Sequence, residues 1–215
     1  MVDFKNKYIN FKIKALHIWS HGLMRAALLG RLSRLGITIV PYYIFEESND
    51  FLITTNIKPI LDKPYETIFL DRNNVGLLEG FDNPFETLAS FSRLWNAGCS
   101  GIGLKSEGSI IAYGWFDLLR CNNKCLSFEL QGDEAYAFNF QTARHMRGRN
   151  IAPFLRTILY DHLQIMGRKR IYSINEKFNT PAMIFKEKIK AKPLCYYVYV
   201  NLFNRFSKNF KNKIM

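Results

Sequence analysis

The sequence predicts an α+β fold in which helices flank a mixed, mostly antiparallel sheet, with an N-terminal extension of helix and extended chain before it. Three observations lead to this prediction. From residue 84 onward, the spacing of apolar residues indicates the order helix, four strands, helix, strand, helix, strand, which is typical of helices packed on a sheet. Short turns between the strands favour antiparallel pairs. Apolar residues make up 48% of the chain and aromatic residues 15%, enough for a substantial core.

The N-terminal extension has one predicted helix. Apolar residues recur at helical spacing over residues 12–35, and Gly36 is a suitable end. Residues 37–45 are predicted to be extended, with Pro41 favouring an edge or a bend. Residues 66–71 are predicted to form a strand.

Capping and turn residues mark the later elements. Asn83 and Pro84 are typical of a helix start, so a helix should run to about Asn96. The elements that follow are predicted to be a hairpin over residues 101–116, a second hairpin over 125–142 that turns at Gly132 and Asp133, a helix over 150–167, a strand over 170–175, a helix over 180–190 and a strand over 193–203.

Positive charge is concentrated in the last third of the chain. The net charge is +12; residues 1–143 hold 14 Lys/Arg and 15 Asp/Glu, whereas residues 144–215 hold 16 and 3. This asymmetry indicates an anionic ligand, an acidic protein partner, nucleic acid or an anionic membrane surface. We expect residues 204–215 to be a basic C-terminal tail, which leaves the arginines near residue 147 to be explained.

Three of these arginines surround a glycine where a predicted strand gives way to a predicted helix. Arg144, Arg147 and Arg149 flank Gly148. A helix N-terminus offers unpaired backbone N–H groups and a partial positive charge, glycine lets the backbone approach a ligand closely, and arginines add charge-assisted hydrogen bonds. The stretch therefore predicts a cradle for a pyrophosphate.

The same stretch resembles motif A of the GNAT superfamily of N-acetyltransferases, whose loop reads Q/R-x-x-G-x-G/A. Arg147 and Ala152 fill the first and last positions, and Asn150, which tolerates left-handed geometry, replaces the central glycine. Residues 179–188 resemble the family's motif B helix through Asn179, Ala182, Glu187 and Lys188. The resemblance covers about residues 98–203, and it implies a GNAT-like fold that uses acetyl-CoA or another acyl-CoA as co-substrate.

The resemblance also implies the binding residues and a division of the chain. Residues 84–203 would form the acyl-CoA-binding domain, and residues 1–83 an extension that forms a wall of the acceptor site. Backbone groups would hold the pantetheine and the pyrophosphate, with Asn179 contacting the CoA arm. The cofactor-binding residues so implied are Phe140, Gln141, Thr142, Arg147, Gly148, Arg149, Asn150, Ile151, Ala152 and Asn179.

In this family the acyl group passes directly to an amine, which needs a base for the ammonium proton and a proton for the leaving thiolate. Glu129 and Glu134, on the predicted hairpin that leads to the cradle, are the nearest carboxylates that could point into the cleft, and they are the candidate bases. The family's Tyr acid is replaced here by Lys186, so the candidate acid is Tyr172 or water, unless the thiolate leaves without an acid. We expect a small amine as acceptor, such as an amino sugar in surface-polysaccharide synthesis.

Other hypotheses remain open. The basic last third would suit an acidic acyl carrier protein as donor, and the departures from both motifs would suit a non-catalytic CoA-binding or interaction protein on the same fold. Nucleic-acid binding is the least favoured hypothesis, because no RNA-recognition signature occurs. The predicted helix over residues 12–35 would also allow peripheral contact with an anionic membrane.

No metal site and no membrane span are expected. His17 and His21 lack a third ligand, and Cys121 and Cys125 are better explained as a turn between two strands than as zinc ligands. The chain has no run of about 18 apolar residues and no signal-peptide pattern, so we expect a cytoplasmic protein.

Overall fold

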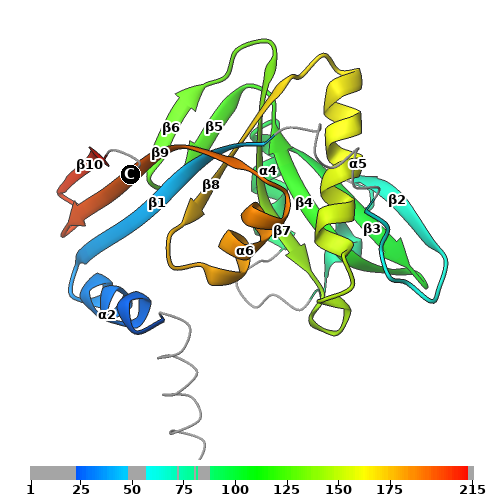
Figure 1. Ribbon diagram of the computed structural model, residues 1–215, viewed down its shortest axis with the longest axis horizontal. Coiled ribbons are helices and arrows are strands. Elements are labelled where there is room, and N and C mark those ends of the chain that lie inside the picture. Colours follow the sequence, from blue (N-terminus) through cyan, green and yellow to red (C-terminus); the bar gives the residue numbers. More distant parts are fainter. Residues whose placement is uncertain (1–22, 48–56, 72, 80, 82–87, 213–215) are drawn as a thin grey trace, which may run out of the picture. The chain divides into compact units, whose positions relative to one another are not determined.

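The computed structural model describes residues 23–47, 57–71, 73–79, 81 and 88–212 (Figure 1). The chain divides into two compact units, which are described separately. The central unit comprises residues 46–173 and 189–192, and the terminal unit comprises residues 1–45, 174–188 and 193–215. Among the described helices, none is both long and apolar enough to cross a membrane.

The central unit contains a mixed, mostly antiparallel sheet with strand order β8-β7-β4-β3-β2. Its strands are β2 (Tyr65–Leu70), β3 (Ser100–Ser106), β4 (Ser109–Asp117), β7 (Glu134–Thr142) and β8 (Arg170–Glu176), of which residues 170–173 belong to this unit. The neighbours from β2 to β7 pair antiparallel, and only β7 and β8 run parallel. This arrangement confirms the predicted fold class.

Two helices of the central unit, α4 (Leu88–Asn96) and α5 (Ile151–Ile165), cover opposite faces of this sheet (Figure 1). Phe91 of α4 lies against the rings of Tyr113 and Trp115, whereas His162 of α5 lies against Phe116. Trp115 and Phe116 are consecutive residues of β4, so they point to opposite faces. The core on the α4 side also includes the short η1 helix (Val75–Leu78).

The prediction that residues 125–142 form one hairpin is wrong. Instead, β5 (Arg120–Asn123) pairs with β6 (Leu126–Glu129) in a separate two-stranded sheet. The Asn123 side chain accepts a hydrogen bond from the backbone N–H of Cys125 at 3.0 Å, which stabilises a tight local turn. β7 pairs with β4 and β8 on its two edges instead of folding back on β6. The expected turn between Cys121 and Cys125 is confirmed.

The terminal unit contains the remaining elements. They are α2 (Leu23–Arg34), β1 (Ile37–Glu47), whose last two residues belong to the central unit, α6 (Thr180–Lys188), β9 (Lys192–Leu202) and β10 (Phe206–Asn212). Aromatic residues join β1 to β9, with Tyr42 stacked on Tyr197 at 5.5 Å between ring centroids and Tyr43 beside Tyr196 at 4.8 Å. The first part of the predicted helix over residues 12–35, with His17 and His21, lies outside the described residues.

The stretch expected to be a basic tail contains a strand. β10 pairs antiparallel with β9, from Phe206 opposite Leu202 to Asn212 opposite Tyr196. Phe203 and Asn204 both have positive φ angles, 53° and 55°, and the Arg205 N–H donates to the Leu202 carbonyl at 3.0 Å, so the chain reverses tightly within the three residues between the strands. Phe206, Lys208 and Phe210 lie on one face of β10, so the segment has no alternating apolar pattern that could have predicted this strand.

Candidate functional site

The loop between β7 and α5 has the backbone geometry of an anion-binding turn. It begins with a short 3-10 helix, η2 (Arg144–Met146). Gly148 has a φ angle of 79°, and Asn150, the residue before the first turn of α5, has a φ angle of 58°. Asn150 therefore adopts the left-handed conformation that Asn tolerates better than most residues. The first N–H groups of a helix have no acceptor within the helix. In α5 these are the N–H groups of Ile151 and Ala152, which directly follow this turn.

The turn is open where a ligand would approach. Apart from its two chain neighbours, no atom of the described residues lies within 4 Å of a Cβ placed at Gly148, and Gly148 is exposed. The partial positive charge of the α5 N-terminus and the exposed side chains of Arg144 and Arg147 give this region the character of an anion site.

Two of the nearby arginines also hold the turn in place. Arg147 donates a hydrogen bond from Nε to the carbonyl of Thr142, the last residue of β7, at 3.2 Å. The guanidinium of Arg149 lies 3.4 Å from the carboxylate of Asp62, and its carbonyl accepts a hydrogen bond from the backbone N–H of Ile60 at 2.9 Å. The loop is therefore fastened to the end of β7 and to the segment that precedes β2.

β7 changes its surroundings along its length. Its pairing with β8 covers Glu134–Tyr136 and does not extend to the last six residues of the strand. Within those six, Asn139 has a φ angle of 52°, and the register with β4 shifts opposite Gly114. This is a β-bulge, which bends a strand and re-aims its backbone groups.

The residues predicted to hold pantetheine lie just after this bulge. The ring of Phe140 occupies the space over Gly114, where a Cβ would lie 2.4 Å from the ring carbons. Gln141 and Thr142 are opposite Tyr113 and Ala112 of β4. All three residues therefore lie between the end of the β7–β8 pairing and the anion-binding turn.

Two of the three candidate catalytic residues are in contact. The Tyr172 hydroxyl donates a hydrogen bond to Oε1 of Glu134 at 2.8 Å. Burial, and then this bond to Glu134, raise the pKa of Tyr172 to about 12, so Tyr172 keeps its proton at neutral pH. Glu134 is buried; its Oε1 also lies 3.1 Å from Arg170, and its Oε2 accepts a hydrogen bond from the Gln131 backbone N–H at 2.8 Å. Both carboxylate oxygens therefore have partners.

The other predicted residues lie elsewhere. Glu129 is exposed at the end of β6, opposite Arg120 in the hairpin, although its neighbour Phe128 lies edge-on to Tyr172 at 6.0 Å. Asn179 belongs to the terminal unit and caps α6, because its side-chain oxygen accepts a hydrogen bond from the Ala182 N–H at 3.3 Å.

A buried ionic network in the central unit was not predicted from the sequence. Glu47 accepts hydrogen bonds from Nε and Nη2 of Arg156, both at 2.7 Å, and from the hydroxyls of Tyr160 and Ser173. All four residues are buried, and the guanidinium of Arg156 lies 4.1 Å from the ring centroid of Phe140. Burial opposes the charge of Arg156, but the adjacent Glu47 carboxylate raises the pKa of Arg156, so the guanidinium stays charged.

One signal could have revealed this network. Ile151, Leu155, Leu159 and Leu163 form the buried apolar row of α5. Arg156 and Tyr160 are four residues apart, and each directly follows a leucine of that row, so the two side chains lie beside the row on the helix surface. Their partner Glu47 is 109 residues away from Arg156 in the sequence, and local patterns carry no information at that separation. Within the described residues, no cluster of three or more potential metal ligands occurs.

Comparisons with known proteins agree with this geometry at the level of the fold. No protein-family model matches the sequence, and no curated protein matches it. Among solved structures, a tandem GNAT protein from the clavulanic acid biosynthesis pathway has a TM-score of 0.57 and 11% identity over 82% of this chain and 55% of its own. A GNAT-family acetyltransferase from Colwellia psychrerythraea has a TM-score of 0.57 and 16% identity over 77% of this chain and 57% of its own.

A conserved protein of unknown function from Staphylococcus epidermidis has a TM-score of 0.56 and 8% identity over 82% of this chain. The chain spans between 55% and 66% of the length of these three structures. At such identities the likeness concerns the fold. The resemblance predicted from motifs A and B is confirmed: the chain has a fold like that of the GNAT acetyltransferases.

Proposed function

We propose that this protein transfers an acyl group from acyl-CoA, with acetyl-CoA as the simplest donor, to the amino group of a small acceptor. The observation that carries the proposal is the turn before α5. Gly148 and Asn150 both have positive φ angles, and they precede free helix N–H groups at the end of a bulged strand. Such a turn suits the diphosphate of CoA, and the GNAT-like fold supports the same assignment.

In the proposed complex the CoA diphosphate binds backbone N–H groups of residues 148–152. The Arg147 N–H already donates to the Arg144 carbonyl at 3.3 Å, so Arg147 contributes its charge. The pantetheine arm lies along residues 140–142 of β7 and forms hydrogen bonds with the strand edge that β8 leaves free. A backbone N–H near the bulge donates to the thioester oxygen as negative charge develops there. Asn179, as a cap of α6, remains a proposed contact of the CoA arm.

The chemistry needs few side chains. The neutral amine attacks the thioester carbonyl and forms a C–N bond, the C–S bond breaks, the nitrogen releases one proton and the thiolate takes one up. Tyr172 holds its proton at neutral pH and is the proposed donor to the thiolate. Glu134 accepts the Tyr172 hydrogen bond and orients that hydroxyl, while Glu129 and Glu134 remain the proposed bases for the ammonium proton.

A non-catalytic CoA-binding protein is the second candidate function. The observation that favours it is the occupation of both Glu134 oxygens by Tyr172, Arg170 and the Gln131 backbone. Such a carboxylate is better placed to orient a hydroxyl than to remove a proton from an amine.

An acyl-transfer assay separates the two candidates. Purified protein is incubated with acetyl-CoA and a panel of primary amines that includes glucosamine, and the N-acetylated amines are measured by mass spectrometry. The proposal predicts an acetylated product that depends on both protein and amine. Saturable acetyl-CoA binding without product from any amine would support the non-catalytic candidate, and the absence of acetyl-CoA binding would contradict both.

A further inference from the structure

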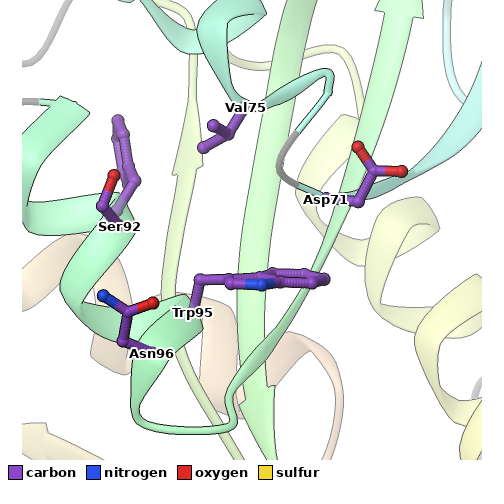
Figure 2. A pocket seen from close by; sticks show the side chains of 6 residues that line it. Asp71, Val75, Ser92, Trp95 and Asn96 are labelled. Atoms are coloured by element: carbon purple, nitrogen blue, oxygen red, sulfur yellow. The ribbon is translucent and has the colours of Figure 1, made fainter.

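A cavity of about 460 Å³ lies beside α4 in the central unit, and none of its lining residues belongs to the turn before α5. Its volume falls within the range of about 300–1,000 Å³ that is usual for small-molecule sites. Figure 2 shows the side chains that line it, from the end of β2, the η1 helix and α4. They are Asp71, Val75, Phe91, Ser92, Trp95 and Asn96.

One helix builds most of the wall. Phe91 and Trp95 are four residues apart on α4, and so are Ser92 and Asn96, so the helix presents an aromatic row beside a polar row. Phe91 is fixed from behind, because it is buried and stacks on Trp115 at 6.0 Å while its ring meets Tyr113 edge-on at 5.7 Å. In Figure 2 the Trp95 ring extends from α4 toward Asp71.

Asp71 supplies a fixed carboxylate on the opposite wall. Its Oδ1 accepts hydrogen bonds from the backbone N–H groups of Asn73 at 2.7 Å and Asn74 at 3.0 Å. Its own N–H donates to the Asn74 side chain at 2.8 Å. Its Oδ2 has no hydrogen-bond partner among the described residues, and none of the six lining residues is Lys or Arg.

We propose that this cavity binds an organic primary ammonium, with its charged nitrogen at Oδ2 of Asp71 and its apolar body on the ring of Trp95. A carboxylate opposite aromatic faces attracts cations both by charge-assisted hydrogen bonding and by interaction with the rings. The Asp71 carboxylate also repels anions, which the turn before α5 would attract. The cavity and the turn would therefore select ligands of opposite charge.

The cavity lies close to the strand proposed for pantetheine. Phe91, its rear wall, contacts Tyr113, and Tyr113 is opposite Gln141 in the register of β4 and β7. The ammonium ligand is therefore the acceptor amine of the acyl transfer. This last step rests on the proposed function, whereas binding of the cation does not.

Matched ligands test the charge requirement. Phenethylamine and 2-phenylethanol share one body and differ in the ammonium, and their binding to the full chain is measured by calorimetry at neutral pH. Phenethylamine should bind more tightly. Asp71→Asn should weaken it by about tenfold or more and leave the affinities for 2-phenylethanol and acetyl-CoA unchanged. Glu79→Gln, a neighbouring exposed carboxylate at the end of η1, should change nothing.

Asp71→Asn could disturb the turn that Asp71 forms with Asn73 and Asn74, so a second pair of variants tests the charge requirement without changing Asp71. Ser92 is exposed on α4, so Ser92→Lys places a cation at the cavity while Ser92→Gln is a neutral control of similar size. Only Ser92→Lys should weaken phenethylamine binding. Equal binding of the amine and the alcohol, or equal affinities in Asp71→Asn and wild type or in the two Ser92 variants, would overturn the proposal.

The same titrations separate this inference from the proposed function. Amine binding that depends on Asp71, together with no binding of acetyl-CoA, would contradict the proposed acyl transfer and leave the cation site standing. Acetyl-CoA binding together with no preference for the ammonium would contradict the cation site alone.

Discussion

Gly148 and Asn150 give the turn before α5 its shape through their backbone conformation. Both φ angles are positive, and a side chain at Gly148 would project into open space. Asn and Asp adopt left-handed conformations more readily than other residues with a side chain. Two substitutions at Gly148 can therefore change charge while they keep nearly the same shape.

We expect Gly148→Asp to weaken acetyl-CoA binding by about tenfold or more, because its carboxylate lies where the diphosphate would bind. Gly148→Asn, which has the same size and no charge, should lose far less affinity. Calorimetric titration of both variants with acetyl-CoA gives the comparison. Equal affinities in the two variants would show that no diphosphate binds at this turn.

Tyr172 is the second residue whose role can be measured. Since its hydroxyl is protonated at neutral pH and bonded to Glu134, Tyr172→Phe should lower kcat about a hundredfold with little change in the KM for acetyl-CoA. Tyr65→Phe, which removes an exposed hydroxyl on β2, serves as the control. If Tyr172→Phe keeps the wild-type kcat, the thiolate takes its proton from water or another group.

At the scale of elements, the Glu47–Arg156 pair joins three of them. Glu47 ends β1, Arg156 and Tyr160 lie on α5, and Ser173 lies on β8. The stacking of Arg156 on Phe140 extends the contact to β7 just after its bulge. The pair therefore fixes the end of β7 that is proposed to hold pantetheine.

We expect Arg156→Met or Glu47→Leu alone to lower the free energy of unfolding by about 3–5 kcal/mol, because each leaves a buried group without its partner. The double variant Arg156→Met/Glu47→Leu should lose less than the sum of the single variants. Urea unfolding provides the four values of this cycle. Arg149→Met, which breaks the exposed contact with Asp62, should cost less than about 1 kcal/mol, and additive losses in the cycle would mean that the pair is not coupled.

Elements with local signals could be predicted from the sequence, and those that depend on distant partners could not. The helix start after Asn150 and the turn between Cys121 and Cys125 were predictable, because capping and turn residues act over a few positions. The pairing of β6 with β5 was missed, because both edges of β7 pair with β4 and β8 and not with its sequence neighbour β6. The residues near β6 and β7 give no local signal of those partners. The burial of Arg156 was missed for the same reason, because Glu47 is 109 residues away.

At the scale of the whole molecule, buried thiols make stability depend on alkaline pH. Burial, followed by the charge of Asp117, raises the pKa values of Cys99 and Cys121 from 9.0 to about 12. Unfolded thiols release protons near pH 9, while the native ones keep them until about pH 12. The unfolded state therefore binds fewer protons between these values, and the free energy of unfolding falls as pH rises.

We expect urea unfolding at pH 8 to 11 to show this decline, with the full contribution present below pH 9. The double variant Cys99→Ala/Cys121→Ala should be less stable at pH 8 and should show a shallower decline. A slope equal to that of the wild type would mean that other groups, such as Tyr172 with its raised pKa, cause the loss.

The distribution of charge over the chain agrees with two ligands of opposite sign. The net charge is +12, and the excess of Lys and Arg begins at the turn before α5. The cavity beside α4, by contrast, has a carboxylate and no basic residue in its lining. The division into an extension over residues 1–83 and an acyl-CoA-binding part over 84–203 stays a prediction, as does the role of the extension as a wall of the acceptor site.

Amide hydrogen exchange with and without acetyl-CoA is the sharpest test of the proposed CoA site, because it reports both binding and the residues that bind. We expect saturating acetyl-CoA to slow exchange in peptides covering residues 140–142 and 147–152, and pantetheine without the nucleotide to protect only the first group. Unchanged exchange of residues 147–152 in the presence of acetyl-CoA would show that the diphosphate does not bind there.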